Sequence, residues 1–313
     1  MAIPNFIRSL FQSTLRTRPP VGMRERVVQC MGPHGLHHIA YTEWGDPDNP
    51  KVLLCVHGFT RNCRDFDALA QVLCKEYRVV CPDVIGRGRS DWLDNKNDYT
   101  FPLYVSDMVT LIARLGALHV DWVGTSMGGL IGILLASEPH SPVRRLVLND
   151  VGPIIPAETL REIGKYVGRA PAFPTMDAVE AYVREVGASF GKLTDEQWQH
   201  ITRYSVHPVE NGYGFVYDPG LGDLFHKGPI LLDVGIWDAY DRLRYPVLAI
   251  RGAESTVLRP DIWQDMAKRG PKAKLVEFKG MGHAPMLMSD DQIRVVRDFL
   301  LSQPSQSEKL LVP

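Results

Sequence analysis

The sequence has no long hydrophobic run, few cysteines and no excess of charge of one sign. No stretch approaches the roughly 18 consecutive apolar residues that a membrane-spanning helix requires, so we expect no stable membrane insertion. Lysine and arginine number 35 against 36 aspartates and glutamates, and the formal net charge of -1 gives no basic surface for nucleic acid. This balance favours a neutral small molecule as partner and leaves the oligomeric state open.

The five cysteines are odd in number, lie in the first third of the chain and form no C-x-x-C pair. A disulfide framework is therefore not expected. Free thiols are typical of a reducing compartment, so the predicted localisation is cytoplasmic. Cys55 and Cys81 lie in apolar runs predicted to be strands, where cysteine acts as a small hydrophobic residue.

Length and composition indicate a folded globular chain. The 313 residues are 45% apolar and 23% charged, both near the average for globular proteins. This length suits one large α/β domain with an insertion, or two ordinary domains. Residues 1–20 contain three arginines and no acidic side chain, as a transit peptide or surface anchor does. We prefer a short docked helix there, because the segment has no long apolar region.

After residue 20, short runs rich in β-branched residues alternate with segments whose apolar residues recur every three or four positions. This alternation predicts a mostly parallel sheet covered by helices. No helix separates the first two strands, which are therefore expected to form an antiparallel hairpin. The eight predicted strands are 26–30, 38–44, 52–56, 78–82, 120–124, 145–149, 247–251 and 274–278. The predicted helices between them are 64–75, 102–115, 127–137, 261–268 and 290–301.

The alternation is interrupted between residues 153 and 244. Helical patterns over 156–167, 176–187 and 194–206 are followed by an aromatic, glycine-containing stretch over 212–221, without a convincing parallel strand. A helical insertion after the sixth strand accounts for this, and such insertions commonly act as lids. The predicted organisation is a basic extension (1–20), a core (21–152 and 245–302), a helical cap (153–244) and a tail (303–313).

Residues 124–128, GTSMG, match the pattern G-x-S-x-G. A predicted strand precedes them and a predicted buried helix follows, which is the strand–turn–helix setting that this pattern requires. A serine on so sharp a turn has a strained backbone, and its neighbours two residues away must be small for strand and helix to approach. Ser126 is therefore the candidate nucleophile, at a helix N-terminus that favours developing negative charge.

With this motif the sequence resembles the α/β-hydrolase family, over roughly residues 25–301. Residues 57–60, HGFT, are similar to the family's oxyanion loop, and residues 83–90, DVIGRGRS, resemble its D-x-x-G-x-G-x-S turn. The loop GHAP, which begins at residue 282, resembles the one that carries the base. The resemblance implies an eight-stranded α/β-hydrolase sheet with a helical cap. It also implies that the backbone N–H groups of Phe59 and Met127 form the oxyanion hole.

Ten histidines are candidates for the general base. His283 lies after the last predicted strand and before the last predicted helix, so it emerges at the same carboxyl edge of the sheet as Ser126. His57 also reaches this edge, but the loop that it resembles uses its histidine to organise the turn. His283 is therefore the predicted base.

Three further histidines, His34, His37 and His38, form a small cluster in the sequence. Such a cluster suggests metal binding, but no carboxylate or thiolate spacing completes a site around it. We interpret the three as surface or strand residues. No metal and no cofactor are predicted.

Two carboxylates compete for the role of the acid that fixes the imidazole tautomer and stabilises the imidazolium. Most α/β-hydrolases supply an aspartate after the strand predicted here at 247–251, but residues 252–256, GAEST, contain only Glu254. Some haloalkane dehalogenases place the acid after the preceding strand, where Asp150 stands. We prefer Asp150 and keep Glu254 as the alternative. A turn-forming aspartate before Gly-Pro is the competing interpretation of Asp150.

The predicted reaction is hydrolysis of a carboxylic ester of a small or medium apolar substrate through an acyl-enzyme. Serine rather than aspartate at position 126 argues against dehalogenation and epoxide opening. Hydrolysis of a carbon–carbon bond, perhydrolysis, acyl transfer to another acceptor and slow-turnover ligand reception are the alternatives. The insertion contains aromatic residues that offer either apolar pocket surface or core, namely Trp198, Phe215, Tyr217, Phe225 and Trp237.

Overall fold

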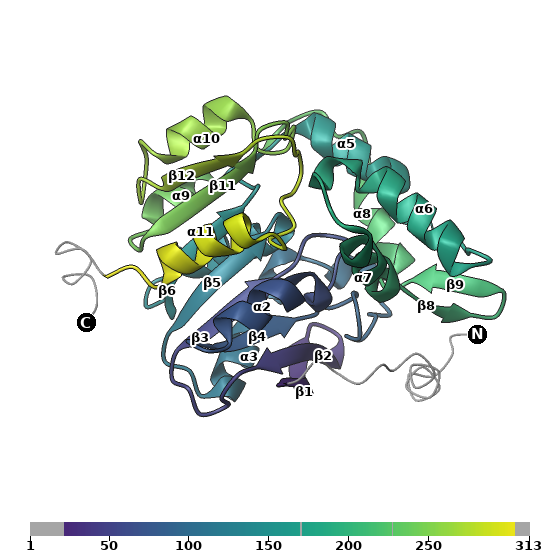
Figure 1. Ribbon diagram of the computed structural model, residues 1–313, viewed down its shortest axis with the longest axis horizontal. Helices are drawn as coiled ribbons and strands as arrows, with labels where there is room; N and C mark the ends of the chain where they lie inside the picture. The colour runs from purple at the N-terminus through teal and green to yellow at the C-terminus, as the bar shows by residue number, and fades with distance from the viewer. Residues whose placement is uncertain (1–21, 170, 227, 304–313) are drawn as a thin grey trace.

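An eight-stranded sheet forms the centre of the molecule (Figure 1). The computed structural model describes residues 22–169, 171–226 and 228–303, so the predicted N-terminal extension and nearly all of the predicted tail lie outside the described residues. The strand order is β1-β2-β4-β3-β5-β6-β11-β12. The β1–β2 and β2–β4 pairs are antiparallel, and the remaining pairs of this sheet are parallel. The predicted mostly parallel sheet with a leading hairpin is confirmed.

The strands follow the apolar runs of the sequence. β3 and β11 are buried at every residue, as parallel strands covered on both faces must be. The edge hairpin is longer than predicted, because its pairing extends from Met23 opposite Trp44 to Gly32 opposite Gly35. The strands of the sheet are β1 (Met23–Gly32), β2 (Gly35–Trp44), β3 (Val52–Val56), β4 (Arg78–Pro82), β5 (Val120–Thr125), β6 (Val143–Asn149), β11 (Val247–Gly252) and β12 (Lys274–Phe278).

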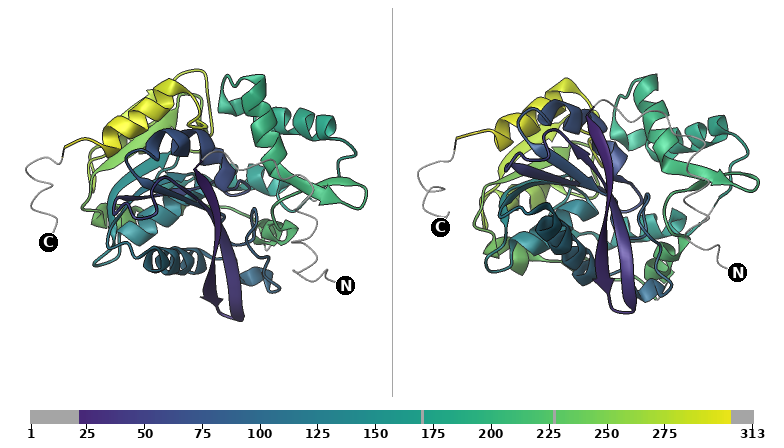
Figure 2. Two further views of the ribbon diagram at one scale, coloured as in Figure 1. Left: turned by 60° about the horizontal axis from the view of Figure 1, so that its bottom comes forward. Right: turned by 90° about the horizontal axis from the view of Figure 1, so that it is seen from below.

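Helices cover both faces of the sheet (Figure 2). α2 (Asp67–Leu73) and α11 (Asp290–Leu300) contribute to one apolar cluster. The helices on the opposite face contribute to a second apolar cluster. They are α3 (Phe101–Leu115), α4 (Met127–Ala136), α9 (Trp237–Arg242) and α10 (Pro260–Met266).

Two of these elements differ from the prediction. The first predicted helix is shorter, since the short 3-10 helix η1 (Cys63–Phe66) precedes α2. α9 was not predicted; it packs on the core through Ala239 and Tyr240.

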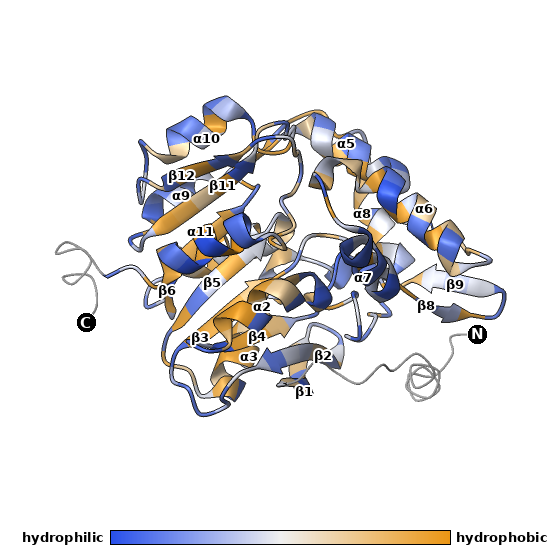
Figure 3. Cartoon of the chain, in the orientation of Figure 1, coloured by the Kyte–Doolittle hydropathy of each residue, from blue (hydrophilic) through white to orange (hydrophobic). Residues whose placement is uncertain are grey.

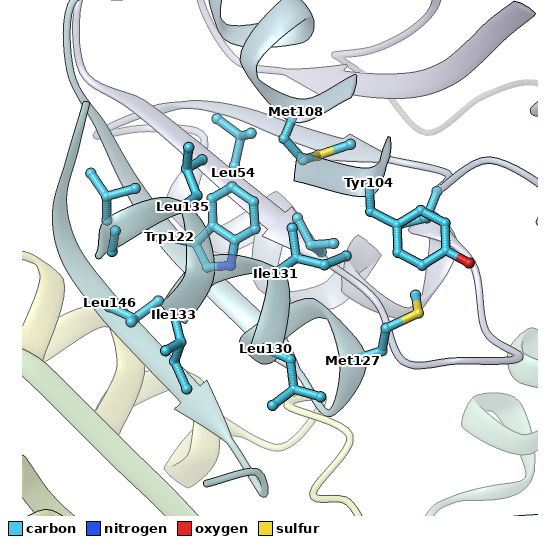
Figure 4. Packing of buried hydrophobic residues seen from close by; sticks show 14 of the residues in the cluster. Leu54, Tyr104, Met108, Trp122, Met127, Leu130, Ile131, Ile133, Leu135 and Leu146 are labelled. Atoms are coloured by element: carbon cyan, nitrogen blue, oxygen red, sulfur yellow. The ribbon is translucent and has the colours of Figure 1, made fainter. Parts of the chain in front are cut away.

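The core beneath α4 is closely packed around a buried tryptophan (Figure 4). Trp122 on β5 is fully buried, and its indole N–H donates to the carbonyl oxygen of Gly128 at 3.0 Å. Leu54, Met108 and Leu146 surround it from β3, α3 and β6. The first turn of α4 is thereby fixed against β5, at the place where the G-x-S-x-G motif lies.

The chain between β6 and α9 forms a separate layer at one end of the sheet (Figures 1 and 2). The three predicted helices correspond to α5, α6 and α7, and part of the aromatic stretch forms β9, which pairs with β8. The domain boundaries around this insertion stay a prediction. Its elements are β7 (Ile154–Ile155), α5 (Ala157–Tyr166), α6 (Met176–Val186), η3 (Ala188–Phe190), α7 (Asp195–Ser205), β8 (Val206–Val209), β9 (Gly212–Phe215), η4 (Pro219–Gly222), α8 (Asp223–His226) and β10 (Val234–Gly235).

The insertion has a small apolar cluster of its own, which includes Val179, Trp198 and Ile201. Met286 and Met288, from the loop between β12 and α11, belong to the same cluster. Figure 3 shows the strongest hydrophobic colour on the central strands, whereas α6 and α7 carry hydrophobic and hydrophilic residues side by side. Across the described parts of the chain, no helix combines the length and apolar character needed to span a membrane.

Candidate active site

Ser126 occupies the sharp turn between β5 and α4. Its backbone angles are φ 52° and ψ -118°, a conformation that non-glycine residues rarely adopt. The flanking glycines are required by space, because a Cβ atom at Gly124 would lie 2.4 Å from the backbone of Gly128. One at Gly128 would lie 2.0 Å from the carbonyl oxygen of Val56. The crowding that the motif predicts is therefore present on both sides of the serine.

His283 lies on the loop between β12 and α11 and faces this turn. Its Nε2 is 3.0 Å from Ser126 Oγ, and its Nδ1 is 2.7 Å from Asp150 Oδ2. The imidazole is 27% exposed, whereas the carboxylate is fully buried. The three side chains, from three separate loops, thus form one continuous hydrogen-bonded chain. Such a chain allows the imidazole to take a proton from the hydroxyl while the carboxylate stabilises the cation that forms.

Asp150 follows β6 and has a positive φ of 55°. Its own N–H donates to the carbonyl oxygen of Ile250 on β11, which ties the turn to the neighbouring strand. Oδ1 accepts the N–H of Gly252 at 2.9 Å, and Oδ2 accepts the hydroxyl of Ser255 at 2.6 Å. Every oxygen of this buried carboxylate therefore has a donor.

Glu254 lies apart from this chain of hydrogen bonds. The residue is exposed, and within the described ranges no hydrogen bond or ion pair joins its carboxylate to His283. Its contact with the loop of His283 runs through the backbone instead, from the Glu254 N–H to the Met281 carbonyl oxygen at 3.0 Å. The structure brings together Ser126, His283 and Asp150, and leaves Glu254 outside.

Sequence reasoning missed Ser255. The sequence offers one signal, since this serine immediately follows Glu254 in the loop where most α/β-hydrolases carry the acid. Its relation to Asp150 depends on the path of the loop after β11.

His57 is fully buried at the carboxyl end of β3. Its Nδ1–H donates to the Gly58 carbonyl oxygen at 2.7 Å, and Nε2 accepts the N–H of Val84 at 2.9 Å. Burial lowers the pKa of His57 from 6.5 to about 4, so the imidazole is neutral at physiological pH. Both ring nitrogens are used to hold the loop that carries Phe59.

The backbone N–H groups of Phe59 and Met127 are not used as donors in any hydrogen bond among the described residues. Met127 begins α4, so its N–H has no acceptor within the helix. A developing oxyanion requires N–H donors that no other acceptor occupies, and Met127 directly follows Ser126 in the chain.

Arg87 is a fully buried cation beside these two residues, which the sequence analysis did not single out. Its Nε donates to the Phe59 carbonyl oxygen at 2.9 Å, and Nη2 lies 3.5 Å from the sulfur of Met127. Nη1 donates to the carbonyl oxygen of Ile85 and to the hydroxyl of Tyr104. No described carboxylate forms an ion pair with the guanidinium. The 83–90 turn thus places a buried guanidinium against the loop that carries Phe59.

The aromatic residues of the insertion have different surroundings. The ring of Phe225 packs edge-on against that of Phe59, with centroids 5.4 Å apart. Trp198 stacks on Phe190 within the insertion. Trp237 contacts Tyr240 and the guanidinium of Arg269. Phe215 and Tyr217 stack on each other.

The histidine cluster near the N-terminal hairpin has partners that sequence spacing did not reveal. His37 is buried, and its Nε2 lies 3.0 Å from a carboxylate oxygen of Asp107 on α3. Cys30 lies opposite His37 in the hairpin, and burial raises the pKa of its thiol to about 12. The interpretation that no carboxylate or thiol accompanies these histidines is wrong. The imidazole and carboxylate hydrogen-bond to each other, and the thiol is protonated.

Comparison with known proteins defines the class. Residues 53–297 match the model of a family described as "Alpha/beta hydrolase family", and the chain belongs to this family. The 3-hydroxybutyrate-oligomer hydrolase of Cupriavidus necator is 48% identical over 280 residues, which cover 87% of this chain and 96% of the relative. An sn-1-specific diacylglycerol lipase, ABHD11 of Mus musculus, is 25% identical, with 76% of each chain covered.

Among solved structures, a putative hydrolase from Rickettsia typhi has a TM-score of 0.82 at 32% identity, covering 89% of this chain and 98% of that one. With these relatives, the predicted class is confirmed. The chain is a hydrolase of the α/β-hydrolase family that acts on ester bonds.

Proposed function

We propose that Ser126 is the nucleophile, His283 the general base and Asp150 the acid of an acyl-enzyme mechanism. The hydrogen-bonded chain from Ser126 Oγ through the imidazole to Asp150 Oδ2, with links of 3.0 and 2.7 Å, is the observation that carries the proposal. His283 takes the hydroxyl proton as Ser126 forms a bond to the ester carbonyl carbon. The carbonyl oxygen becomes the oxyanion, held by the N–H groups of Phe59 and Met127.

Collapse of this first intermediate breaks the ester C–O bond. The His283 imidazolium gives its proton to the departing alcohol, and the acyl group stays on Ser126. Water then attacks the acyl carbon while His283 takes one of its protons, and the second collapse returns the proton to Ser126 and releases the acid. No cofactor takes part in these steps.

The proposed substrates are short ester oligomers of hydroxy acids. The support is the 48% identity, over nearly the whole of both chains, to a relative named for 3-hydroxybutyrate oligomers. In the proposed organisation, residues 153–244 act as a cap over the carboxyl edge. We assign Phe225 to the boundary of the acyl site, because its ring contacts that of Phe59. The five free cysteines suit a reducing compartment such as the cytoplasm.

A single substitution tests the nucleophile. Ser126→Ala is expected to abolish both ester hydrolysis and covalent labelling by a fluorophosphonate, because it removes the hydroxyl that is hydrogen-bonded to His283 Nε2. Ser106→Ala, at an exposed position on α3, is the matched control and should behave as wild type. Labelling that persists in Ser126→Ala would exclude Ser126 as the nucleophile.

A substrate series tests the proposed class. Turnover of 3-hydroxybutyrate dimer and trimer is to be compared with that of p-nitrophenyl esters from acetate to dodecanoate. We expect kcat/KM to be highest for the oligomers and the short acyl chains. A maximum of kcat/KM at long acyl chains would contradict the proposed substrate class, whereas the assignment of the catalytic residues would still stand. Products that form only with an added alcohol would instead indicate acyl transfer.

A further inference from the structure

The loop after β11 places a hydroxyl where many relatives of this family place the acid. Ser255 is 6% exposed, and its Oγ donates to Asp150 Oδ2 at 2.6 Å. The same oxygen accepts the Nδ1–H of His283 at 2.7 Å. The hydroxyl and the imidazole therefore meet on one carboxylate oxygen.

The direction of the Ser255 proton is fixed by its neighbours. A serine hydroxyl has one donor hydrogen and two acceptor lone pairs. Ser255 Oγ accepts the backbone N–H groups of Val257 and Leu258 at 3.2 and 3.3 Å, which occupies both lone pairs. Its hydrogen is left for Asp150, so the donor cannot rotate to another acceptor without breaking these contacts.

The backbone around Ser255 is itself clamped. The guanidinium of Arg251 on β11 donates to the carbonyl oxygens of Ser255 at 3.2 Å and of Leu258 at 2.8 Å. Its other nitrogen pairs with Glu277 on β12. Arg251 is 4% exposed, and its bonds to the Ser255 and Leu258 carbonyl oxygens are buried. These contacts hold the backbone that carries the donor hydroxyl.

These contacts supply hydrogen bonds to the Asp150 carboxylate and fix its orientation. A fully buried carboxylate needs hydrogen-bond donors, and it needs a fixed orientation to keep one lone pair toward Nδ1. The Gly252 N–H holds Oδ1 at 2.9 Å and the Ser255 hydroxyl holds Oδ2. The rotation of the carboxylate is thereby locked on both sides.

We propose that Ser255 is a positioning residue, which acts on catalysis through the orientation and charge of Asp150. The proposal rests on the proposed function, in which Asp150 is the acid. Ser255 touches neither substrate nor reacting atoms, so its removal is expected to change kcat and leave KM unchanged.

The experiment measures kcat and KM for p-nitrophenyl acetate in Ser255→Ala, Asp150→Asn and the double variant. Ser255→Ala is expected to lower kcat by about 10- to 100-fold, as the loss of one hydrogen bond to a buried charged group does, with KM within about twofold of wild type. In the Asp150→Asn background the same change should cost less than about threefold, because its target is already gone. Full additivity of the two losses would overturn the proposal.

Ser141→Ala is the matched control. Ser141 is also buried, and its Oγ also accepts the N–H two residues further on, that of Val143 at 3.3 Å, but it lies just before the start of β6. It should retain wild-type kcat. If Ser255→Ala does not fold, Ser255→Cys keeps the shape with a weaker donor, and an unchanged kcat there would overturn the proposal.

A second readout follows the hydrogen bond itself. The downfield proton signal of the His283 Nδ1–H should move in Ser255→Ala and stay in place in Ser141→Ala. A signal that does not move would overturn the proposal. Wild-type activity in Asp150→Asn would mean instead that the assignment of the acid is wrong, so the two failures are distinguishable.

Discussion

His57 and His283 both follow strands of the same sheet and both emerge at its carboxyl edge, yet their surroundings differ in every respect. His57 is fully buried, and both of its ring nitrogens bond to the backbone of Gly58 and Val84. His283 is part exposed and lies between a hydroxyl and a carboxylate. The residue type and the position along the fold are shared, so the partners of the ring decide what each histidine can do.

The difference teaches what a general base requires. A base must be able to gain a proton and lose it again, which needs a donor on one side and a stabilising anion on the other. In His57 one ring nitrogen is occupied by the N–H of Val84 and the other faces a carbonyl oxygen, and burial holds its pKa near 4. We therefore regard His57 as part of the framework of the oxyanion loop and His283 as the group that carries the proton.

The largest expected effect separates the two histidines directly. His283→Gln should lower kcat by about 10,000-fold or more while the unfolding midpoint in urea stays near that of wild type. His57→Leu should instead cost about 2 kcal/mol of folding free energy, because the buried N–H of Val84 loses its acceptor. Activity assays and urea titrations of both variants test this, and the reverse pattern would contradict the assignment.

The second-largest expected effect concerns Asp150, the proposed acid partner of His283. Asp150→Asn should lower kcat by about 10,000-fold, because an amide in place of the carboxylate favours the wrong imidazole tautomer. Steady-state kinetics on a short p-nitrophenyl ester measure it. The variant should keep its fold, since the amide preserves the size of the side chain. A loss below tenfold would place the acid elsewhere.

The third effect follows from the low pKa of His57. In the unfolded chain this histidine has its ordinary pKa near 6.5, so between pH 6.5 and about 4 the unfolded state binds a proton that the folded state does not. Stability therefore falls as the pH is lowered through this window, by about 2 kcal/mol between pH 7 and pH 5. Urea unfolding at both pH values measures it. His283→Gln should show the same loss of stability between pH 7 and pH 5. If the loss is absent in this variant, the effect belongs to His283 and not to His57.

The smallest effect concerns the carboxylate nearest to the usual family position. Glu254→Gln should change kcat by less than about twofold, because the side chain is exposed and only its backbone contacts the loop of His283. The same ester assay used for Asp150→Asn gives the comparison. A loss of several orders of magnitude would make Glu254 the acid after all.

Much of the fold and of the candidate site could be predicted, because the signals are local. Ser126 is marked by a strand, a glycine-flanked turn and a buried helix within a few residues of one another. The choice between Asp150 and Glu254 is of another kind, since it depends on which strand ends lie side by side. β6 and β11 are neighbours although nearly 100 residues separate them, and the N–H of Asp150 reaches across to Ile250.

Other contacts escaped prediction for the same reason. His37 and Asp107 lie 70 positions apart in the sequence, and only the packing of α3 on the hairpin brings them together. The extent of η1 and the short helix α9 depended on tertiary contacts, because short helices have little stability of their own. The role of Ser255 required the course of a loop, which no periodicity encodes.

The loop that carries His283 also supports the insertion. Ser189 of η3 donates its hydroxyl to the His283 carbonyl oxygen at 2.7 Å, and its own carbonyl accepts the N–H of Gly282 at 2.6 Å. Met286 and Met288 share the apolar cluster of the insertion. For protein engineering this means that the insertion is not an independent module. A chimera that takes residues 153–244 from a relative will have to take residues 281–288 with them, because otherwise the loop that carries His283 loses its contacts with the insertion.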